Sequence, residues 1–492
     1  MVQQKLELGR YANFIASEWI SPSTGKYYTR ENPATLEPLA ELPSSGRDDV
    51  NHAVEAAREA FEKSDWATRR PAERARALLK LAQIIREESD RLARILTLEN
   101  GKPLKFAKGE FIFTADVFEF YAGLARQVMG ESYQNSSQIY SIASKEPVGV
   151  CGMITPWNFP ISLLAWKLAP ALAVGCTVVV KPSSYTTAIT FEFLKLFERV
   201  QEIPKGVVNC VSGPGSVVGM ELVRHKDVNK IGFTGETGTG KVIMQNAAMS
   251  LKRVSLECGG KCPNIVFEDA DMNKALPGAV WGAFRNSGQV CTAGSRLLVQ
   301  ESIYDEFMEK FVEKTKEMKV GNGLEPDVVL GPLISKDQLE KVLQYVEIGK
   351  QEGAKVLYGG RRLSEKGYFM EPTIFVDADN SMRISQEEIF GPTVTVIKFR
   401  DEEEAVKIAN DTVYGLAAAL WTNNLQRAMR VSSQLKAGTV WVNTYADLYP
   451  EMPFGGYKES GLGRELGREG LEEYLETKHI NFDMRPQVVM WR

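Results

Sequence analysis

One cysteine of the sequence combines small neighbours with an accessible setting. Cys291 lies in the stretch NSGQVCTAG (286–294), where the flanking side chains are small or polar. A thiol acts as a nucleophile when it is reachable and when its surroundings favour the thiolate. Cys151, Cys176 and Cys210 instead lie within or beside apolar, β-branched stretches and are predicted to be small core residues. Cys291 is therefore the predicted nucleophile.

A nucleophilic thiol needs a base, and the sequence offers a carboxylate rather than an imidazole. The chain has three histidines, none of them close to Cys291 in sequence, so a Cys–His dyad is not supported. Glu257 ends a predicted buried strand in SLECGGK, where burial raises a carboxyl pKa toward the range of a general base. The alternative for a glutamate at a strand end is a salt bridge, and the residues leave both interpretations open.

Composition argues against several other classes of function. Among 492 residues, 59 are basic and 63 acidic, which gives a net charge of −4 without any basic block, so no nucleic-acid partner is predicted. Six cysteines without a signal peptide do not indicate a disulfide framework. Cys258 and Cys262 form a single C-x₃-C pair with no histidine nearby, so no metal site is predicted.

Nothing in the sequence predicts secretion or a membrane span. The N-terminal stretch MVQQKLELGRYANF lacks the apolar segment and cleavage site of a secretory signal. The run 160–180 is long enough to cross a bilayer, but Pro170 and Gly175 divide it into a helix-like piece and a β-branched piece. That pattern predicts a helix followed by a buried strand. We expect a soluble cytoplasmic protein without a membrane partner.

Strand and helix patterns alternate after a helical segment at 50–128. Helices are expected between the strands, and this βαβ order predicts a parallel sheet covered on both faces. The predicted strands lie at 148–155, 177–181, 207–212, 230–234 and 253–257.

A second alternating block runs from 263 to about 445 and predicts another α/β unit. It includes predicted helices at 303–318 and 335–352 and a predicted strand at 393–399. Two further segments remain, a hairpin pattern at 130–146 and an apolar, strand-like tail at 477–492. Their apolar edges predict contact between subunits, in a homodimer or homotetramer.

A glycine-rich turn follows the predicted strand at 230–234. The segment KIGFTGETGTGK has the order strand, turn and helix start that favours a phosphate group. From Gly235 it nearly matches a P-loop, but Val242 stands where a Ser or Thr would bind Mg²⁺. The segment therefore supports a nucleotide-binding turn and a plain tight turn equally well. A P-loop-like NTPase stays a remote alternative.

The motifs together are similar to those of a known family. They follow one another over nearly the whole chain as TPWNFP (155–160), KPSS (181–184), GFTGETGTG (232–240), LECGGKCPNIVFEDAD (256–271), GQVCTAGSRLLV (288–299), EEIFGP (387–392) and PFGGYKESGLGRELG (453–467). In this order the chain resembles the non-phosphorylating, NAD(P)-dependent members of the aldehyde dehydrogenase superfamily.

The resemblance implies an α/β architecture of three parts. These are a Rossmann-like cofactor domain, a second α/β catalytic domain and a small β oligomerisation arm. The expected boundaries are 1–128 with 147–258 for the dinucleotide-binding domain, 259–460 for the catalytic domain, and 129–146 with 470–492 for the arm.

The resemblance also implies a mechanism. Cys291 attacks the aldehyde carbon to give a thiohemiacetal, which Asn158 and the backbone N–H of Cys291 stabilise as an oxyanion. Hydride transfer to the nicotinamide leaves a thioester, which a water activated by Glu257 hydrolyses. Lys167 and Glu465 match positions proposed to relay the proton, with a structural ion pair as the alternative.

Further positions match the family's cofactor site. Lys181 corresponds to the lysine that holds the adenosine ribose, and Gly235 to the pyrophosphate position; Glu236 departs from the usual serine and is expected to point outward. Ser184 replaces the glutamate usual in NAD-preferring members, which removes a clash with a 2′-phosphate and predicts that NADP is accepted as well as NAD. The cofactor set is Thr155, Trp157, Lys181, Ser183, Ser184, Gly215, Gly235, Glu236, Glu388 and Phe390.

The positions carried over for the substrate pocket are mostly apolar. They are Phe159, Leu163, Trp166, Arg285, Val290, Thr292, Leu448 and Phe454. Arg285 stands where many members have an aromatic residue, and it either binds a substrate carboxylate, as in succinate-semialdehyde-like enzymes, or faces solvent or another subunit. Trp166 and Phe454 equally suit a cationic substrate such as betaine aldehyde.

Overall fold

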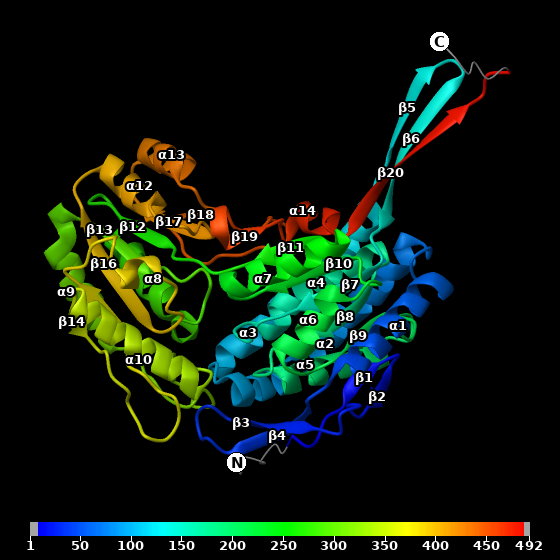
Figure 1. The fold of residues 1–492 in the computed structure, drawn as a ribbon. Helices are drawn as coiled ribbons and strands as arrows, with labels where there is room; N and C mark the ends of the chain where they lie inside the picture. Colours follow the sequence, from blue (N-terminus) through cyan, green and yellow to red (C-terminus); the bar gives the residue numbers. More distant parts are fainter. Residues whose placement is uncertain (1–7, 487–492) are drawn as a thin grey trace.

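Two separate β-sheets, both largely parallel, form the frame of the computed structural model, which describes residues 8–486 (Figure 1). In the first sheet the five central strands run parallel, and antiparallel strands close both edges. Its order is β19 (Gly461–Leu462), β11 (Arg253–Glu257), β10 (Lys230–Thr234), β7 (Val150–Ile154), β8 (Thr177–Lys181), β9 (Val208–Cys210), β1 (Asn13–Ile15) and β2 (Glu18–Ile20).

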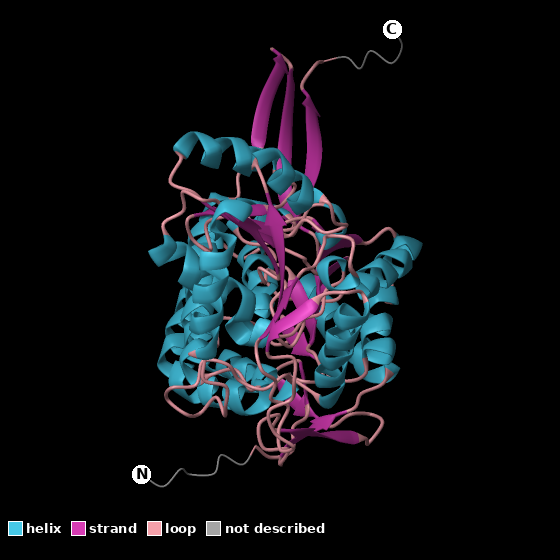
Figure 2. Cartoon of the chain, turned by 90° about the vertical axis from the view of Figure 1, so that its left-hand side faces the viewer, coloured by secondary structure: helices cyan, strands magenta, loops and turns pink. Residues whose placement is uncertain are grey.

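Helices pack on both faces of the sheets (Figure 2). This arrangement confirms the predicted α/β fold class. The α-helices are α1 (Arg47–Lys63), α2 (Pro71–Asn100), α3 (Leu104–Leu124), α4 (Pro160–Val174), α5 (Thr187–Leu194), α6 (Met220–Arg224), α7 (Thr237–Ala247), α8 (Met272–Phe284), α9 (Tyr304–Lys316), α10 (Lys336–Gln351), α11 (Arg383–Gln386), α12 (Glu402–Asn410), α13 (Leu425–Gln434) and α14 (Gly467–Glu472).

The side chains of β8 point alternately to the two faces of the first sheet, and helices cover both faces. Val178 and Val180 face a core cluster shared with α2 and α4, whereas Val179 faces a second cluster shared with α1 and α6. Successive side chains of a strand point to opposite faces, so a strand buried on both faces has an unbroken apolar sequence. All five strands predicted between residues 148 and 257 are present, some with slightly shorter ends.

The second sheet lies beside the first and follows the same construction. Six of its strands are parallel, and helices α9 and α10 and strand β16 confirm the three elements predicted for this block. The sheet runs in the order β14 (Lys355–Tyr358), β15 (Thr373–Val376), β16 (Thr393–Phe399), β13 (Arg296–Gln300), β12 (Pro263–Val266), β17 (Ala417–Trp421) and β18 (Thr439–Val442).

The apolar run at 160–180 is a helix and a strand, as predicted. Every residue of α4 is buried, and Gly175 ends the helix with a left-handed φ of 100° before β8 begins. The long apolar stretch is therefore core rather than membrane span. Within residues 8–486, no helix has the length and apolarity needed to cross a bilayer.

A three-stranded antiparallel sheet extends away from the body of the molecule (Figures 1 and 2). It consists of β5 (Glu131–Ser136), β6 (Ile139–Pro147) and β20 (Leu475–Asp483), and we call it the arm. The hairpin predicted at 130–146 forms β5 and β6, and the predicted tail strand forms β20. Residues 487–492 of that predicted tail lie outside the described residues. A separate pair, β3 (Tyr27–Glu31) and β4 (Pro38–Pro43), lies at the opposite end.

Candidate active site

Cys291 lies in the loop that joins α8 to β13. Asn286 and Ser287 both have left-handed backbone angles, with φ of 52° and 55°, and Gly288 continues the turn with φ of 67°. A Cβ at Gly288 would lie 1.9 Å from the carbonyl oxygen of Gly391, so this turn requires glycine. The loop leaves Cys291 half-buried, whereas the other five cysteines are buried. Cys291 is thus the accessible thiol that the sequence predicts.

Two cavities meet at Cys291, which lines both. The larger cavity, of about 310 Å³, contains all eight residues that the sequence assigns to a substrate pocket. They are Phe159, Leu163, Trp166, Arg285, Val290, Thr292, Leu448 and Phe454. The smaller cavity, of about 190 Å³, lies where β10 and β11 end and includes Asn158, Thr234 and Gly259 in its wall. Two bound molecules can therefore approach one sulfur from different sides.

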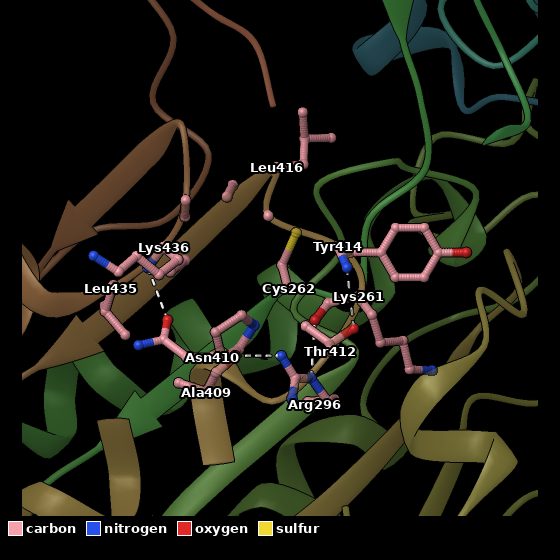
Figure 3. Close-up of a pocket in the computed structure, with 15 residues that line it drawn as sticks. Lys261, Cys262, Arg296, Ala409, Asn410, Thr412, Tyr414, Leu416, Leu435 and Lys436 are labelled. Atoms are coloured by element: carbon pink, nitrogen blue, oxygen red, sulfur yellow. Dashed lines mark hydrogen bonds between the residues drawn. The ribbon is translucent and has the colours of Figure 1, made fainter. Parts of the chain in front are cut away.

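A third, narrow pocket lies beside Cys262 (Figure 3). Its volume of about 10 Å³ holds roughly one water molecule. Arg296, which is fully buried, donates to the carbonyl oxygen of Lys261 at 2.9 Å and to two carbonyl oxygens at the end of α12. The Cys262 thiol in turn lies 3.7 Å from the carbonyl oxygen of Cys291. The contacts around this pocket support the loop behind Cys291. The pocket itself has no room for a substrate.

Asn158 is tied directly to the cysteine loop. It follows β7, is buried, and donates one amide hydrogen to the carbonyl oxygen of Gln289 at 3.1 Å. Its own backbone carbonyl oxygen accepts from the Asn286 amide at 3.4 Å. The second hydrogen of the Asn158 amide remains for another acceptor. Asn158 therefore supplies a fixed donor in the wall of the smaller cavity, which also contains Cys291.

The surroundings of Cys291 favour its protonated form. Burial raises the pKa of the thiol well above its usual 9.0, and the nearby carboxylate of Glu388 raises it further, while Arg285 lowers it. Burial and the nearby carboxylate therefore both disfavour the thiolate. The reactive thiolate consequently depends on a base or on a bound cation to form.

Glu257 ends β11 with a buried carboxyl group. Both carboxyl oxygens lack a hydrogen-bond partner among the described residues, and burial followed by the charge of Glu465 raises the pKa well above 4.5. A Cβ at Gly455 would lie 2.9 Å from Glu257 Oε1, so glycine at 455 leaves space for the carboxyl. Glu257 is absent from the walls of both cavities. Its charge nevertheless acts on the Cys291 thiol, so the two groups lie in the same part of the site.

Lys167 and Glu465 lie next to Glu257 and form a buried ion pair. Lys167 Nζ is 2.5 Å from Glu465 Oε1 and donates to Thr234 Oγ1 at 2.5 Å. The second oxygen, Glu465 Oε2, is buried without a partner among residues 8–486. The ion pair that the sequence offered as an alternative is thus present, and it is coupled electrostatically to Glu257.

Five of the ten predicted cofactor residues line the smaller cavity: Trp157, Gly235, Glu236, Glu388 and Phe390. Glu388 Oε1 accepts from the backbone N–H of Gly260 at 3.0 Å, and burial raises its pKa to about 7. Phe390 packs edge-on against Trp157 with 5.3 Å between the ring centres.

The other five, Thr155, Lys181, Ser183, Ser184 and Gly215, lie beyond this cavity, around the ends of β7 and β8. The Thr155 N–H donates to the carbonyl oxygen of Lys181 at 3.2 Å, and burial lowers the pKa of Lys181 to about 8. Gly215 begins a π-helical turn, Gly215–Gly219. Residues of both groups follow the carboxyl ends of parallel strands in the first sheet, the edge at which doubly wound sheets form their ligand crevice.

The structure shows where two charged residues of the glycine-rich turn lie. Glu236, which was expected to point outward, is exposed and also lines the smaller cavity, where its charge helps to raise the pKa of Glu388. Because α7 begins immediately after Glu236, the side chain stays at the rim of the crevice. Lys241, the lysine of the near P-loop match, pairs with Glu459 at the surface at 2.8 Å. It does not line the smaller cavity.

Arg285 is half-buried in the wall of the larger cavity, which favours contact with a bound ligand over a position that faces solvent or another subunit. Its guanidinium donates to Thr292 Oγ1 at 3.1 Å in the wall of the larger cavity and lies 5.9 Å from the centre of the Phe159 ring. Its Nε is buried without a hydrogen-bond partner, and burial lowers its pKa. Among the residues that the structure describes, it forms no ion pair. A cation in this position is available to a ligand in the larger cavity.

Two buried charged residues of the larger cavity were missed by sequence reasoning. Lys102 and Glu110 line it as an ion pair, and Lys102 Nζ lies 3.8 Å from the centre of the Phe159 ring. A signal exists for Glu110, because it occupies the buried stripe of α3 with Ala107 and Thr114. No pattern marks Lys102. The part of the wall that was not predicted also includes Lys105, Phe106, Gly109, Phe113, Ser162, Trp281, Asn286 and Ala446.

Comparison with known proteins decides the family. Residues 19–480 match the Aldehyde dehydrogenase family. The chain belongs to this family. Membership makes the protein an NAD(P)-dependent oxidoreductase acting on aldehydes and excludes the P-loop NTPase alternative.

Relatives among curated and solved proteins agree with this assignment. A betaine aldehyde dehydrogenase of Bacillus subtilis is 46% identical over 97% of this chain and 98% of its own length. An aldehyde dehydrogenase of Davidiella tassiana is 45% identical over 95% and 94%. A betaine aldehyde dehydrogenase of Staphylococcus aureus, solved with NAD⁺, is 42% identical with a TM-score of 0.96 and covers 98% of this chain and 97% of its own.

Proposed function

We propose that this aldehyde dehydrogenase forms a carboxylic acid through a thioester on Cys291. The position of Cys291 between the two cavities supports this most strongly. The sulfur adds to the carbonyl carbon, and the Asn158 amide donates to the resulting oxyanion. A nicotinamide dinucleotide bound in the crevice accepts the hydride that leaves the same carbon. Water then attacks the thioester carbon, which releases the acid and restores the thiol.

The crevice has groups that fit a dinucleotide. The Thr155 hydroxyl is buried without a partner, and Lys181 is a buried cation with a lowered pKa beside it. At the other end, α7 begins two residues after Gly235 and directs its first N–H groups outward, which suits a pyrophosphate. Thr155, Lys181 and Ser183 would hold the adenosine half, and Glu388 with Phe390 the nicotinamide half.

Glu257 is proposed as the base for thioester hydrolysis. Burial raises the pKa of its carboxyl well above the usual value, which makes the carboxylate a stronger base. In the observed position it lies near the Lys167–Glu465 pair, whose partly unsatisfied carboxylate can take the proton onward. Rotation toward Cys291 and back would then link the attacking water to this pair.

Ser184 supports acceptance of NADP as well as NAD. The residue is partly exposed at the adenosine end, where Tyr28 Oη donates to its backbone carbonyl oxygen at 3.1 Å and leaves its hydroxyl available. A carboxylate at this position would repel a 2′-phosphate, whereas a hydroxyl can donate to it. The S. aureus relative was solved with NAD⁺, which fits use of the unphosphorylated cofactor too.

Arg285 favours a substrate whose tail carries a carboxylate. The guanidinium is half-buried, its Nε is buried without a partner, and it forms no ion pair within residues 8–486, so it is satisfied by an anionic group and repels a quaternary ammonium. We therefore place semialdehydes of the succinate-semialdehyde type first. Betaine aldehyde is the second candidate, because two of the relatives above carry that name and because Trp166 and Phe454 form an aromatic wall with ring centres 5.1 Å apart.

One experiment tests the reaction and ranks these substrates. The purified enzyme is assayed by absorbance of the reduced nicotinamide with NAD⁺ and NADP⁺ against succinate semialdehyde, betaine aldehyde and an uncharged aliphatic aldehyde. We expect activity with at least one aldehyde, the highest kcat/KM with the semialdehyde, and none with Cys291→Ala. Full activity of Cys291→Ala would contradict the thioester mechanism.

Assembly of several copies is proposed from the arm. Nearly every residue of β5 and β20 is exposed, including Tyr133 at 53% and Phe482 at 47% exposure, and both outer strands have unpaired edges. Such edges are usually covered by another chain, so we propose a homodimer or homotetramer, to be checked by light scattering. A monomer at micromolar concentration would refute it.

We further propose that the sheets correspond to functional domains. The first sheet would belong to a cofactor domain of residues 1–128 and 147–258, and the second to a catalytic domain of residues 259–460. The arm would then comprise 129–146 and 470–492. A cytoplasmic location stays a prediction from the sequence.

A further inference from the structure

A buried carboxylate holds the segment that carries Asn158. Glu110 lies on α3 and is only 5% exposed. Its Oε1 accepts the backbone N–H groups of Ile161 at 3.1 Å and of Ser162 at 3.2 Å, which belong to the first turn of α4. The first N–H groups of a helix have no acceptor within the helix. Glu110 therefore caps α4 from a neighbouring helix.

The remaining contacts of Glu110 are also made to this corner of the molecule. Its Oε2 pairs with Lys102, which is 2% exposed, and its backbone carbonyl oxygen accepts from Ser162 Oγ at 3.3 Å. A buried carboxylate that loses a partner is costly, because the remaining charge stays uncompensated. Glu110 is thus held in one position by three polar contacts, and α4 is held with it.

The capped turn follows Asn158 after only two residues. Phe159 is the N-cap of α4 and Pro160 is its first residue, so the backbone has little freedom between the cap and Asn158. On the other side of Asn158, the Asn100 amide donates to the carbonyl oxygen of Trp157 at 2.7 Å. The Asn158 backbone is therefore fixed from both sides, and Glu110 provides the fixed point on the helix side.

We propose that Glu110 is a positioning residue of the reaction, which acts through Asn158 by fixing the start of α4. This inference rests on the proposed role of Asn158 as the oxyanion donor. An oxyanion donor must lie where charge develops, and a displacement of a fraction of an ångström lowers its effect. Glu110 itself need not touch the reacting atoms.

A double-mutant cycle tests the coupling. The single-turnover rate of reduced nicotinamide formation at saturating aldehyde is measured for the native enzyme, Glu110→Ala, Asn158→Ala and the double variant. We expect Glu110→Ala to lower this rate about 10- to 100-fold when Asn158 is present but by less than about threefold when it is absent. Equal fold losses in both backgrounds would overturn the proposal. A native rate for Asn158→Ala would instead refute the proposed oxyanion role.

Two further double variants remove the charges of both Lys102 and Glu110 and control for unfolding. Lys102→Met/Glu110→Gln keeps an acceptor for the two N–H groups, whereas Lys102→Met/Glu110→Met does not, and both pairs are neutral. Because both pairs lack the Lys102 cation, the comparison is made between them, and we expect the methionine pair to be about 10- to 100-fold slower than the glutamine pair. Equal rates for the two pairs would overturn the proposal. Glu119→Gln, at an exposed site on the same helix, serves as the matched control.

Discussion

The two cavities that share Cys291 differ in charge. The larger one combines an aromatic and apolar wall with three cations, Lys102, Lys105 and Arg285, of which Lys102 is paired with Glu110. The smaller one holds two carboxylates, those of Glu236 and Glu388, and one cation, Lys341. The thiol between them is buried enough to have a raised pKa. The two cavities thus present different charges to the same cysteine, which is their common point.

Loss of the proposed base has the largest expected effect on turnover. Glu257→Gln removes the group that activates water, so we expect kcat to fall about 10²- to 10⁴-fold while the first turnover still forms reduced nicotinamide. Stopped-flow absorbance should show a burst of reduced nicotinamide, followed by almost no further formation in the steady state. Loss of the burst and the steady state to the same extent would contradict a role confined to hydrolysis.

The pH dependence of kcat tests the raised pKa values of Glu257 and Cys291. Because burial raises the pKa values of both Glu257 and Cys291, their reactive ionised forms increase as pH rises, and the native kcat should increase from acidic pH through neutral pH. Glu257→Gln should lose the part of this increase that belongs to hydrolysis. A native kcat that is constant or falls from pH 6 to pH 9 would contradict the direction of both shifts.

Exchange of the unpaired cation should change the selectivity of the larger cavity. Arg285→Phe removes the proposed partner of a carboxylate, so kcat/KM for succinate semialdehyde should fall about 10- to 100-fold. The value for an uncharged aldehyde should change little, and that for betaine aldehyde should rise. Lys105→Phe, a matched change at a more exposed wall residue, is the control. An equal loss for all three aldehydes would show a structural role instead.

The smallest expected effect concerns the far end of the cofactor crevice. Ser184→Glu places a carboxylate where a 2′-phosphate would lie, so KM for NADP⁺ should rise about tenfold or more while KM for NAD⁺ changes little. Initial rates with varied cofactor check this. Similar increases for both cofactors would contradict the proposed 2′-phosphate contact.

Local patterns were sufficient for the frame, but not for side-chain orientation. The valine run of β8 and the divided apolar run at 160–180 predicted the strand and helix α4 directly. An unbroken apolar sequence is the pattern of an element that is buried on all sides. Eight wall residues of the larger cavity followed from the family resemblance, whereas Lys102 and Glu110 did not. Arg285, Glu257 and Glu236 were harder, since whether a side chain faces a cavity depends on residues distant in sequence, such as Thr292 against Arg285 or Gly455 against Glu257.

The central claim is that one thiol carries the acyl group between the two cavities. Intact-protein and peptide mass spectrometry of Glu257→Gln, incubated with aldehyde and oxidised cofactor, tests it most directly. We predict a stable acyl group, equal in mass to the aldehyde less one hydrogen, on the peptide that contains Cys291, and only when cofactor is present. Formation of reduced cofactor without acylation of Cys291, or with the acyl group on another cysteine, would contradict the account.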